Sequence, residues 1–170
     1  MIKKRIAIFF VVVACFIVQN TMLKSIDFGA VSPNLLLIIT AGFGFAGGRK
    51  EGMYVGFASG LLIDLVYGDV VGMYAVLFVV IGYVVGICNE IYYTDELSVP
   101  IILIAISDFM FNFAYYVFNF LLRGRLDVLY YIWRTILPEV VYTVLVAVVL
   151  YQLLHTLNYY LELKEDKEVL

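Results

Sequence analysis

Histidine, cysteine and charged residues are scarce in this sequence, and each scarcity removes a class of function. The chain has one histidine, His155, which excludes HExxH metal sites and triads assembled from several histidines. The two cysteines, Cys15 and Cys88, lie 73 residues apart, a distance that matches neither a CxxC motif nor a zinc spacing. We therefore predict no catalytic residue, no metal site and no cofactor, and we expect His155 to be an interfacial polar residue.

Charged residues make up only 15% of the chain, and the net charge is −3. Nucleic-acid binding needs a basic surface, which such a chain does not offer. Hydrophobic residues make up 64%, well above the roughly one-half that is typical of soluble domains. Because the charges are also segregated and leave long apolar runs, we infer that most of the chain is surrounded by membrane lipid.

The apolar runs predict an all-α fold, a polytopic membrane helical bundle that forms one domain over residues 1–170. Transmembrane helices are expected at residues 4–23, 32–47, 52–67, 70–89, 97–122 and 135–157. The second and third runs are short, so a re-entrant hairpin over residues 32–67 is the alternative. The polar segments between the runs reach about a dozen residues, too few for an independent domain of 50 or more. No enzyme domain is therefore expected outside the membrane.

Basic residues favour an orientation with both termini in the cytoplasm. The first run follows a basic N-terminus, but it is longer than a signal-peptide core and lacks a small-residue cleavage site, which indicates a retained helix. With the N-terminus inside, 7 of the 11 basic residues face the cytoplasm, including two in the expected tail, residues 162–170.

Small residues recur at every fourth position in one stretch of the chain. The series is Gly52, Gly56, Gly60, Asp64, Gly68 and Gly72. On a helix this spacing produces a slowly drifting stripe, along which another helix can approach closely because no bulky side chain intervenes. We predict a helix-packing or partner interface, and a ligand bound against the glycines is the alternative.

A second stripe, on the predicted fifth helix, is polar. Asp108, Asn112, Tyr115 and Asn119 fall on one helix face. A polar stripe in lipid turns inward, where its groups can hydrogen-bond across helices. A polar substrate pocket and a proton or ion path are the alternatives.

Two further acids, Asp64 and Glu139, are expected near the outer ends of their helices. Intramembrane carboxylates need a partner, and arginine side chains at this depth can extend toward them. We therefore predict an outer-rim charge cluster of Arg123, Arg134 and Glu139, which with Asp64 would join the third and sixth helices.

Residues 123–134 are expected to form an outer loop or a short interfacial helix. Leu126, Leu129, Tyr130 and Trp133 recur at helical spacing, and their aromatic rings suit the headgroup region. The simpler interpretation is an anchor that sets helix depth, and docking to a partner's juxtamembrane segment is the alternative.

Several of these features together resemble one protein family. They are the basic N-terminus, Pro33-Asn34 at the start of the second helix, the charged tail, and the run Gly56-x3-Gly60-Leu-Leu-x-Asp64-x3-Gly68-x3-Gly72-x2-Ala75. Over its whole length the chain resembles the bacterial rod shape-determining MreD family. The resemblance implies a fold similar to the substrate-binding S components of energy-coupling-factor vitamin transporters, and a location in the bacterial cytoplasmic membrane.

The resemblance also implies function and partners. It implies a non-enzymatic subunit of the cell-elongation machinery that works with MreC, MreB, RodA and a class B penicillin-binding protein. Asp64 and the glycines match the family's motif as structural or interface positions. The leading hypothesis is thus a scaffold that binds partner helices, and the alternative is a vitamin-type substrate-binding transporter subunit.

Overall fold

The computed structural model describes residues 2–23, 32–68, 72–91, 98–119 and 127–169, and nearly all of these residues are helical. The elements are α1 (Ile2–Val18), η1 (Gln19–Leu23), α2 (Leu35–Tyr67), α3 (Met73–Ile91), α4 (Ser98–Asn119), α5 (Val128–Tyr131), η3 (Ile132–Ile136) and α6 (Leu137–Val169). No strand occurs in the described ranges, so the predicted all-α class is confirmed. Four stretches are long and apolar enough to cross a membrane: Lys4–Thr21, Met73–Ile91, Ser98–Asn119 and Val128–Leu153.

Helix α2 is broken at Gly48, where φ is 79° and ψ is −173°. This conformation favours glycine, which has no Cβ to clash with the backbone. The chain folds back at this point, since the Thr40 hydroxyl lies 3.4 Å from the Ser59 hydroxyl although 19 residues separate them. Along a straight helix the two residues would be about 28 Å apart. The predicted segments 32–47 and 52–67 therefore correspond to the two antiparallel arms of one helical hairpin.

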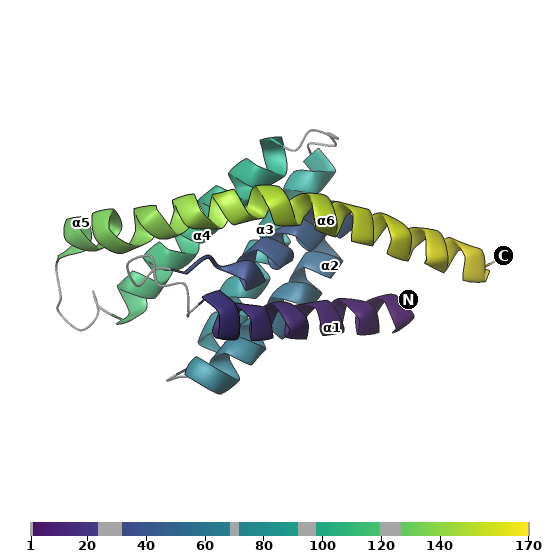
Figure 1. Ribbon diagram of the computed structural model, residues 1–170, viewed down its shortest axis with the longest axis horizontal. Helices are drawn as coiled ribbons and strands as arrows, with labels where there is room; N and C mark the ends of the chain where they lie inside the picture. The colour runs from purple at the N-terminus through teal and green to yellow at the C-terminus, as the bar shows by residue number, and fades with distance from the viewer. Residues whose placement is uncertain (1, 24–31, 69–71, 92–97, 120–126, 170) are drawn as a thin grey trace.

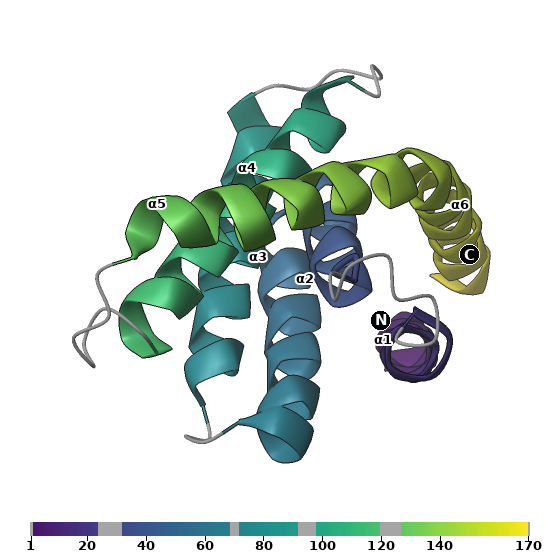
Figure 2. The same cartoon turned by 60° about the vertical axis from the view of Figure 1, so that its left-hand side comes forward.

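The first arm of the hairpin is the core of the molecule. Every residue from Leu35 to Phe45 is buried. A helix that is apolar on all sides needs neighbours on all sides. The second arm, α1 and α6 enclose it, as the dark blue ribbon in Figure 2 shows.

The remaining helices are arranged around this hairpin. Helix α3 lies antiparallel along the second arm of α2, in the most extensive helix contact of the structure. Helix α6 crosses over α2 and α4, and its C-terminal end lies at the same end of the molecule as the start of α1 (Figure 1). The start of α1, the turn of the α2 hairpin and the end of α3 lie together at one end of the molecule, and the residues after α1 and the end of α2 lie together at another.

One of these ends, which we call the tip end, holds the turn of the α2 hairpin and two ion pairs. Lys4 near the start of α1 contacts Glu51 at 2.5 Å between nitrogen and oxygen. Arg49 contacts Glu90, near the end of α3, at 2.7 Å. The Arg5 guanidinium lies 5.8 Å from the ring centroid of Tyr54.

Two segments that the sequence analysis places outside the spans are helical where the structure describes them. The segment 162–170 is expected as a charged tail, and its described part, to Val169, is a helical continuation of α6. Its Leu, Glu and Lys residues are good helix formers, which explains the extension. Of the expected outer segment 123–134, the structure describes residues 127–134, which form α5 and part of η3 and run directly into α6.

Candidate functional site

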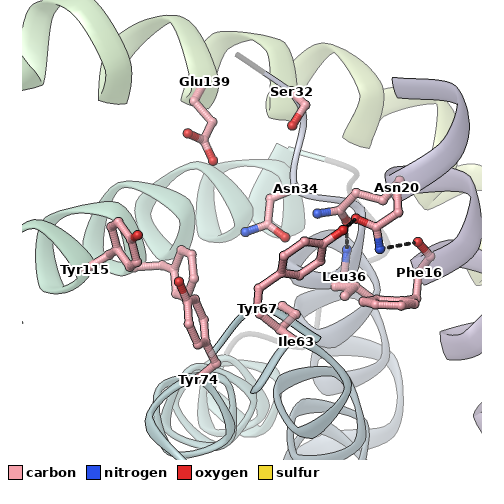
Figure 3. A pocket seen from close by; sticks show the side chains of 12 residues that line it. Phe16, Asn20, Ser32, Asn34, Leu36, Ile63, Tyr67, Tyr74, Tyr115 and Glu139 are labelled. Atoms are coloured by element: carbon pink, nitrogen blue, oxygen red, sulfur yellow. Dashed lines mark hydrogen bonds between the residues drawn. The ribbon is translucent and has the colours of Figure 1, made fainter. Parts of the chain in front are cut away.

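A cleft of about 410 Å3 opens at the end of the molecule opposite the tip end. Its lining residues come from the end of α1 and η1, both ends of α2, the start of α3, the end of α4 and the first turn of α6 (Figure 3). They are Phe16, Gln19, Asn20, Ser32, Asn34, Leu36, Ile63, Tyr67, Tyr74, Phe111, Tyr115 and Glu139. We call this feature the outer cleft, because the predicted topology places it on the outer side.

The amide side chains of the cleft hold helix ends in place. The Asn34 side chain caps α2 by accepting a hydrogen bond from the Leu37 amide at 3.1 Å. The Gln19 side chain accepts from the Leu36 amide at 3.2 Å, so the start of η1 also caps α2. The first amide groups of a helix lack intrahelical partners, and these side chains satisfy two of them.

The Asn20 amide group is also engaged. Its oxygen accepts a hydrogen bond from the Tyr67 hydroxyl at 2.7 Å, and its nitrogen donates to the Phe16 carbonyl at 2.9 Å. These contacts connect the end of α1 to the end of α2.

Aromatic rings form much of the remaining wall. Tyr74 of α3 packs against Phe111 and Tyr115 of α4, with ring centroids 5.9 Å apart in each pair. On the other side, the Phe16 and Tyr67 rings lie 6.5 Å apart. The cleft therefore combines an aromatic surface with a few polar groups, which is the usual composition of small-molecule sites.

The charged group of the cleft is Glu139. It points from α6 into the cleft in Figure 3, and it adjoins the Asn112 side chain and the Asp108 carboxylate behind it. Asp108 is completely buried, and neither of its oxygens meets a donor in hydrogen-bonding geometry among the described residues, although the Thr143 hydroxyl lies beside it. Two carboxyl groups thus adjoin one another without a basic residue between them.

The predicted polar stripe divides into two parts. Asp108 and Asn112 are buried beside Glu139, and Tyr115 lines the outer cleft. The amide nitrogens of Asn112 and Asn119 both donate to carbonyls one turn earlier in α4, those of Asp108 and Tyr115, at 3.1 Å. Asn119 therefore bonds to its own helix and does not line the cleft.

The glycine stripe lies against α3. A Cβ added to Gly52 would collide with the Gly82 carbonyl, one on Gly56 with the backbone of α3, and one on Gly60 with Ala75. Each would come closer than 3.0 Å, which real Cβ atoms essentially never do. The two helix backbones touch along this stripe, so it is filled by the chain itself.

Asp64 connects α2 to the start of α3. Its carboxylate oxygens accept hydrogen bonds from the Tyr74 amide at 3.0 Å and the Ala75 amide at 2.9 Å. The rest of the motif serves the same turn. Gly68 packs so closely on the Asp64 backbone that a Cβ would collide with it, and Gly72 adopts a positive φ of 105°.

The expected outer-rim charge cluster differs from the observed arrangement. Arg123 lies outside the described residues, Arg134 is exposed, and the Asp64 carboxylate is bonded to α3. Glu139 is five residues beyond Arg134, which on a helix turns it about 140° away. Its neighbours are consequently Asp108 and Asn112 rather than an arginine.

The expected interfacial anchor is exposed where the structure describes it. Leu129, Tyr130 and Trp133 have 72%, 66% and 69% of their surface accessible, and Leu126 lies outside the described residues. These side chains are free to meet lipid or a partner helix.

Several residues of the site were not predicted from the sequence. Gln19, Asn20 and Thr143 carry no motif, because their role depends on helices that are distant in sequence. Gly82 and Gly86 of α3 were not identified as packing positions, although they are spaced four residues apart on an apolar helix. That spacing was the available signal for the α3 side of the close contact between α2 and α3, which we call the glycine seam.

Long apolar helices, polar groups gathered at helix ends and a glycine seam define a helical membrane protein. Among the described residues no group of three His, Cys, Asp or Glu side chains could hold a metal ion. Residues 2–160 match the rod shape-determining protein MreD family, and the chain belongs to that family. The predicted membership is thus confirmed, and the family is one of shape determination rather than a known enzyme family. Neither a curated protein nor a solved structure matches the chain.

Proposed function

We propose that this chain is a non-enzymatic scaffold subunit of the bacterial cell-elongation machinery, and that it organises peptidoglycan synthesis through helix contacts. The proposed partners are an MreC-type single-pass protein and, through it, MreB, RodA and a class B penicillin-binding protein. The observation that carries the proposal is the family match over residues 2–160. Nearly all residues that the structure describes are helical, which agrees with a role exerted within the membrane.

The proposed topology has six crossings with both termini in the cytoplasm. It is supported by the alternation of helix ends, since α1 leads from the tip end to the outer cleft and the first arm of α2 leads back. Basic residues gather at the tip end, where Lys4, Arg5, Arg49 and Lys50 lie. Basic residues favour the cytoplasmic side, which supports a cytoplasmic tip end. An S-component-like arrangement of these six segments remains part of the proposal.

The partner surfaces proposed here are the exposed apolar ones. The glycine seam is occupied by α2 and α3 of the same chain, so we assign it to internal packing. The surface of Leu129, Tyr130 and Trp133 and the exposed face of α4 at Ile102, Ile106 and Met110 have no counterpart among the described residues. In lipid, such faces associate by packing and shape rather than by a hydrophobic driving force.

The test is complementation in a rod-shaped bacterium depleted of its own MreD-family protein. A tagged copy of the chain should restore rods, and the MreC-type protein should copurify from mild detergent. Rounded cells and no copurifying MreC-type protein, with the chain present in the membrane at normal levels, would contradict the proposal. A variant with Ile102, Ile106 and Met110 changed to leucine, alanine and leucine keeps the face apolar but alters its shape, and it should weaken copurification if α4 is the contact.

One observation favours a second candidate function, that of a small-molecule-binding membrane subunit. The outer cleft has the volume and aromatic lining of a ligand site. Mass spectrometry of the protein purified in mild detergent distinguishes the two. A stoichiometric vitamin-like molecule would favour the second function, and an MreC-type partner without one would favour the first.

A further inference from the structure

We propose that the outer cleft binds a cationic organic group, an ammonium or guanidinium carried on an apolar body, with Glu139 as its counter-ion. Binding of such a cation does not depend on the proposed role in cell shape. It extends the second candidate function but does not require it, because a lysine or arginine side chain of a partner can supply the same group.

The ionisable groups in and behind the cleft are acidic. Glu139 points into the cleft, and none of the described lining residues is basic. Behind it Asp108 adds a second carboxyl group, which is fully buried and, among the described residues, meets no donor in hydrogen-bonding geometry although the Thr143 hydroxyl lies beside it. A buried charge away from water needs a partner of opposite sign. The cleft therefore favours a cation and disfavours an anion.

The amide side chains that line the cleft already make hydrogen bonds within the protein. The oxygens of Gln19, Asn20 and Asn34 accept hydrogen bonds from the Leu36 amide, the Tyr67 hydroxyl and the Leu37 amide. These amides hold helix ends together and already have their partners. Glu139 is the one carboxyl group among the described lining residues, and a carboxylate is a stronger acceptor for a cationic donor than an amide or a hydroxyl.

The wall of the cleft is largely aromatic. Rings of Phe16, Tyr67, Tyr74, Phe111 and Tyr115 line the cleft. Aromatic faces attract ammonium and guanidinium groups, and they also pack against an apolar body. An inorganic cation prefers several oxygen ligands, whereas Glu139 is the only acid among the described lining residues. An organic cation thus fits the lining better than a metal ion does.

The test uses the purified full-length chain in detergent micelles. The probes are phenethylammonium chloride and its neutral counterpart 2-phenylethanol, and the readouts are thermal unfolding and calorimetric titration. Phenethylammonium should raise the unfolding temperature and bind, while the alcohol should do neither. Equal effects of the amine and the alcohol, or the same stabilisation by sodium chloride at equal concentration, would overturn the proposal.

Variants locate the site. Glu139→Gln should weaken binding of phenethylammonium about tenfold or more, since a charged partner is lost. Asp127→Asn removes the same charge from an exposed position that does not line the cleft and should bind as the parent does. Unchanged affinity in a folded Glu139→Gln protein would overturn the assignment.

A second pair covers the case in which Glu139→Gln does not fold. Tyr115→Phe keeps the ring and should retain the affinity, whereas Tyr115→Leu removes it and should weaken binding several-fold. Equal affinity in both variants would place the amine elsewhere and overturn the proposal.

Two arms then identify the natural source of the cation. A free amine should appear by mass spectrometry in gently purified protein and be absent from Glu139→Gln. A partner side chain should instead be displaced by phenethylammonium, which would release a copurified protein from the parent chain. Because the binding tests use isolated protein, their failure would leave the proposed role in cell shape unaffected.

Discussion

The Asp64 carboxylate, near the end of α2, accepts a hydrogen bond from the Ala75 backbone amide, in the first turn of α3, at 2.9 Å. The second carboxylate oxygen accepts from the neighbouring Tyr74 amide, so one side chain satisfies two of the unpaired amides of α3. The positive end of the helix dipole also favours a negative charge there. Asp64 thus acts as the helix cap of α3 from ten residues upstream, and this role explains a carboxylate buried in an apolar hairpin.

The two-oxygen geometry predicts a graded response at this position. Asp64→Asn keeps one acceptor but presents an NH2 group to the second amide, so we expect a loss of about 1–2 kcal/mol in the free energy of unfolding. Asp64→Leu leaves both amides without a partner and should cost more. The measurement is unfolding of the purified protein in mixed micelles.

A matched control exists at Asp127, the residue before α5. Its side chain makes no capping hydrogen bond, so Asp127→Asn should leave the stability unchanged. If Asp64→Asn and Asp64→Leu prove equally and severely destabilising, charge rather than acceptor geometry governs the site.

The glycine seam predicts that the effect of a substitution on stability depends strongly on its position along α3. Gly82→Ala places a methyl group against the Gly52 backbone, where no flexible side chain can yield. We expect a loss of about 1–3 kcal/mol from this overpacking. Val84→Leu, half exposed on the same helix, should change the stability little. Equal tolerance of the two substitutions would show that the backbones do not touch at Gly82.

Much of the fold follows from patterns within single segments. Apolar runs predicted the positions of α1, α3, α4 and α6. A helix that crosses lipid needs an apolar run of about 20 residues, and such a run can be read from the sequence. The small-residue series predicted the close approach at Gly52, Gly56 and Gly60, since spacing on one helix determines its face. What lies on the other side of the seam, Gly82, depends on tertiary packing, which one segment does not encode.

The site was harder to predict for the same reason. Asp108 and Glu139 were each identified as intramembrane acids. Their proximity depends on how α4 and α6 pack against each other, which neither segment encodes alone. The expected cluster of Glu139 and Arg134 relied on their common depth in the membrane, whereas five residues along a helix turn the two side chains about 140° apart. Asp64 was assigned to the same cluster because side-chain charge, rather than the unpaired amides of α3, was considered as its partner.

The ion pair between Lys4 and Glu51 predicts coupling between α1 and the hairpin tip. The two side chains are 10% and 25% exposed, so their charges are only partly screened by water. Either Lys4→Met or Glu51→Gln should lower the free energy of unfolding by about 1–3 kcal/mol, between the values for surface and buried pairs. The double variant should lose less than the sum of the two. Strict additivity would mean that the pair does not contribute.

The proposed topology is tested by cysteine labelling in intact cells, after replacement of Cys15 and Cys88 by alanine. A cysteine at the exposed Asp127 should react with an impermeant reagent from outside, because the start of α6 lies at the outer cleft. A cysteine at Lys50, beside the hairpin turn, should react only after the membrane is opened, because six crossings place the tip end in the cytoplasm. Labelling of Lys50→Cys from outside would show that the hairpin does not reach the cytoplasm in this orientation. A reporter that works only in the cytoplasm should be active when it is fused after Leu170. Activity of a periplasmic reporter at this position would require an odd number of crossings.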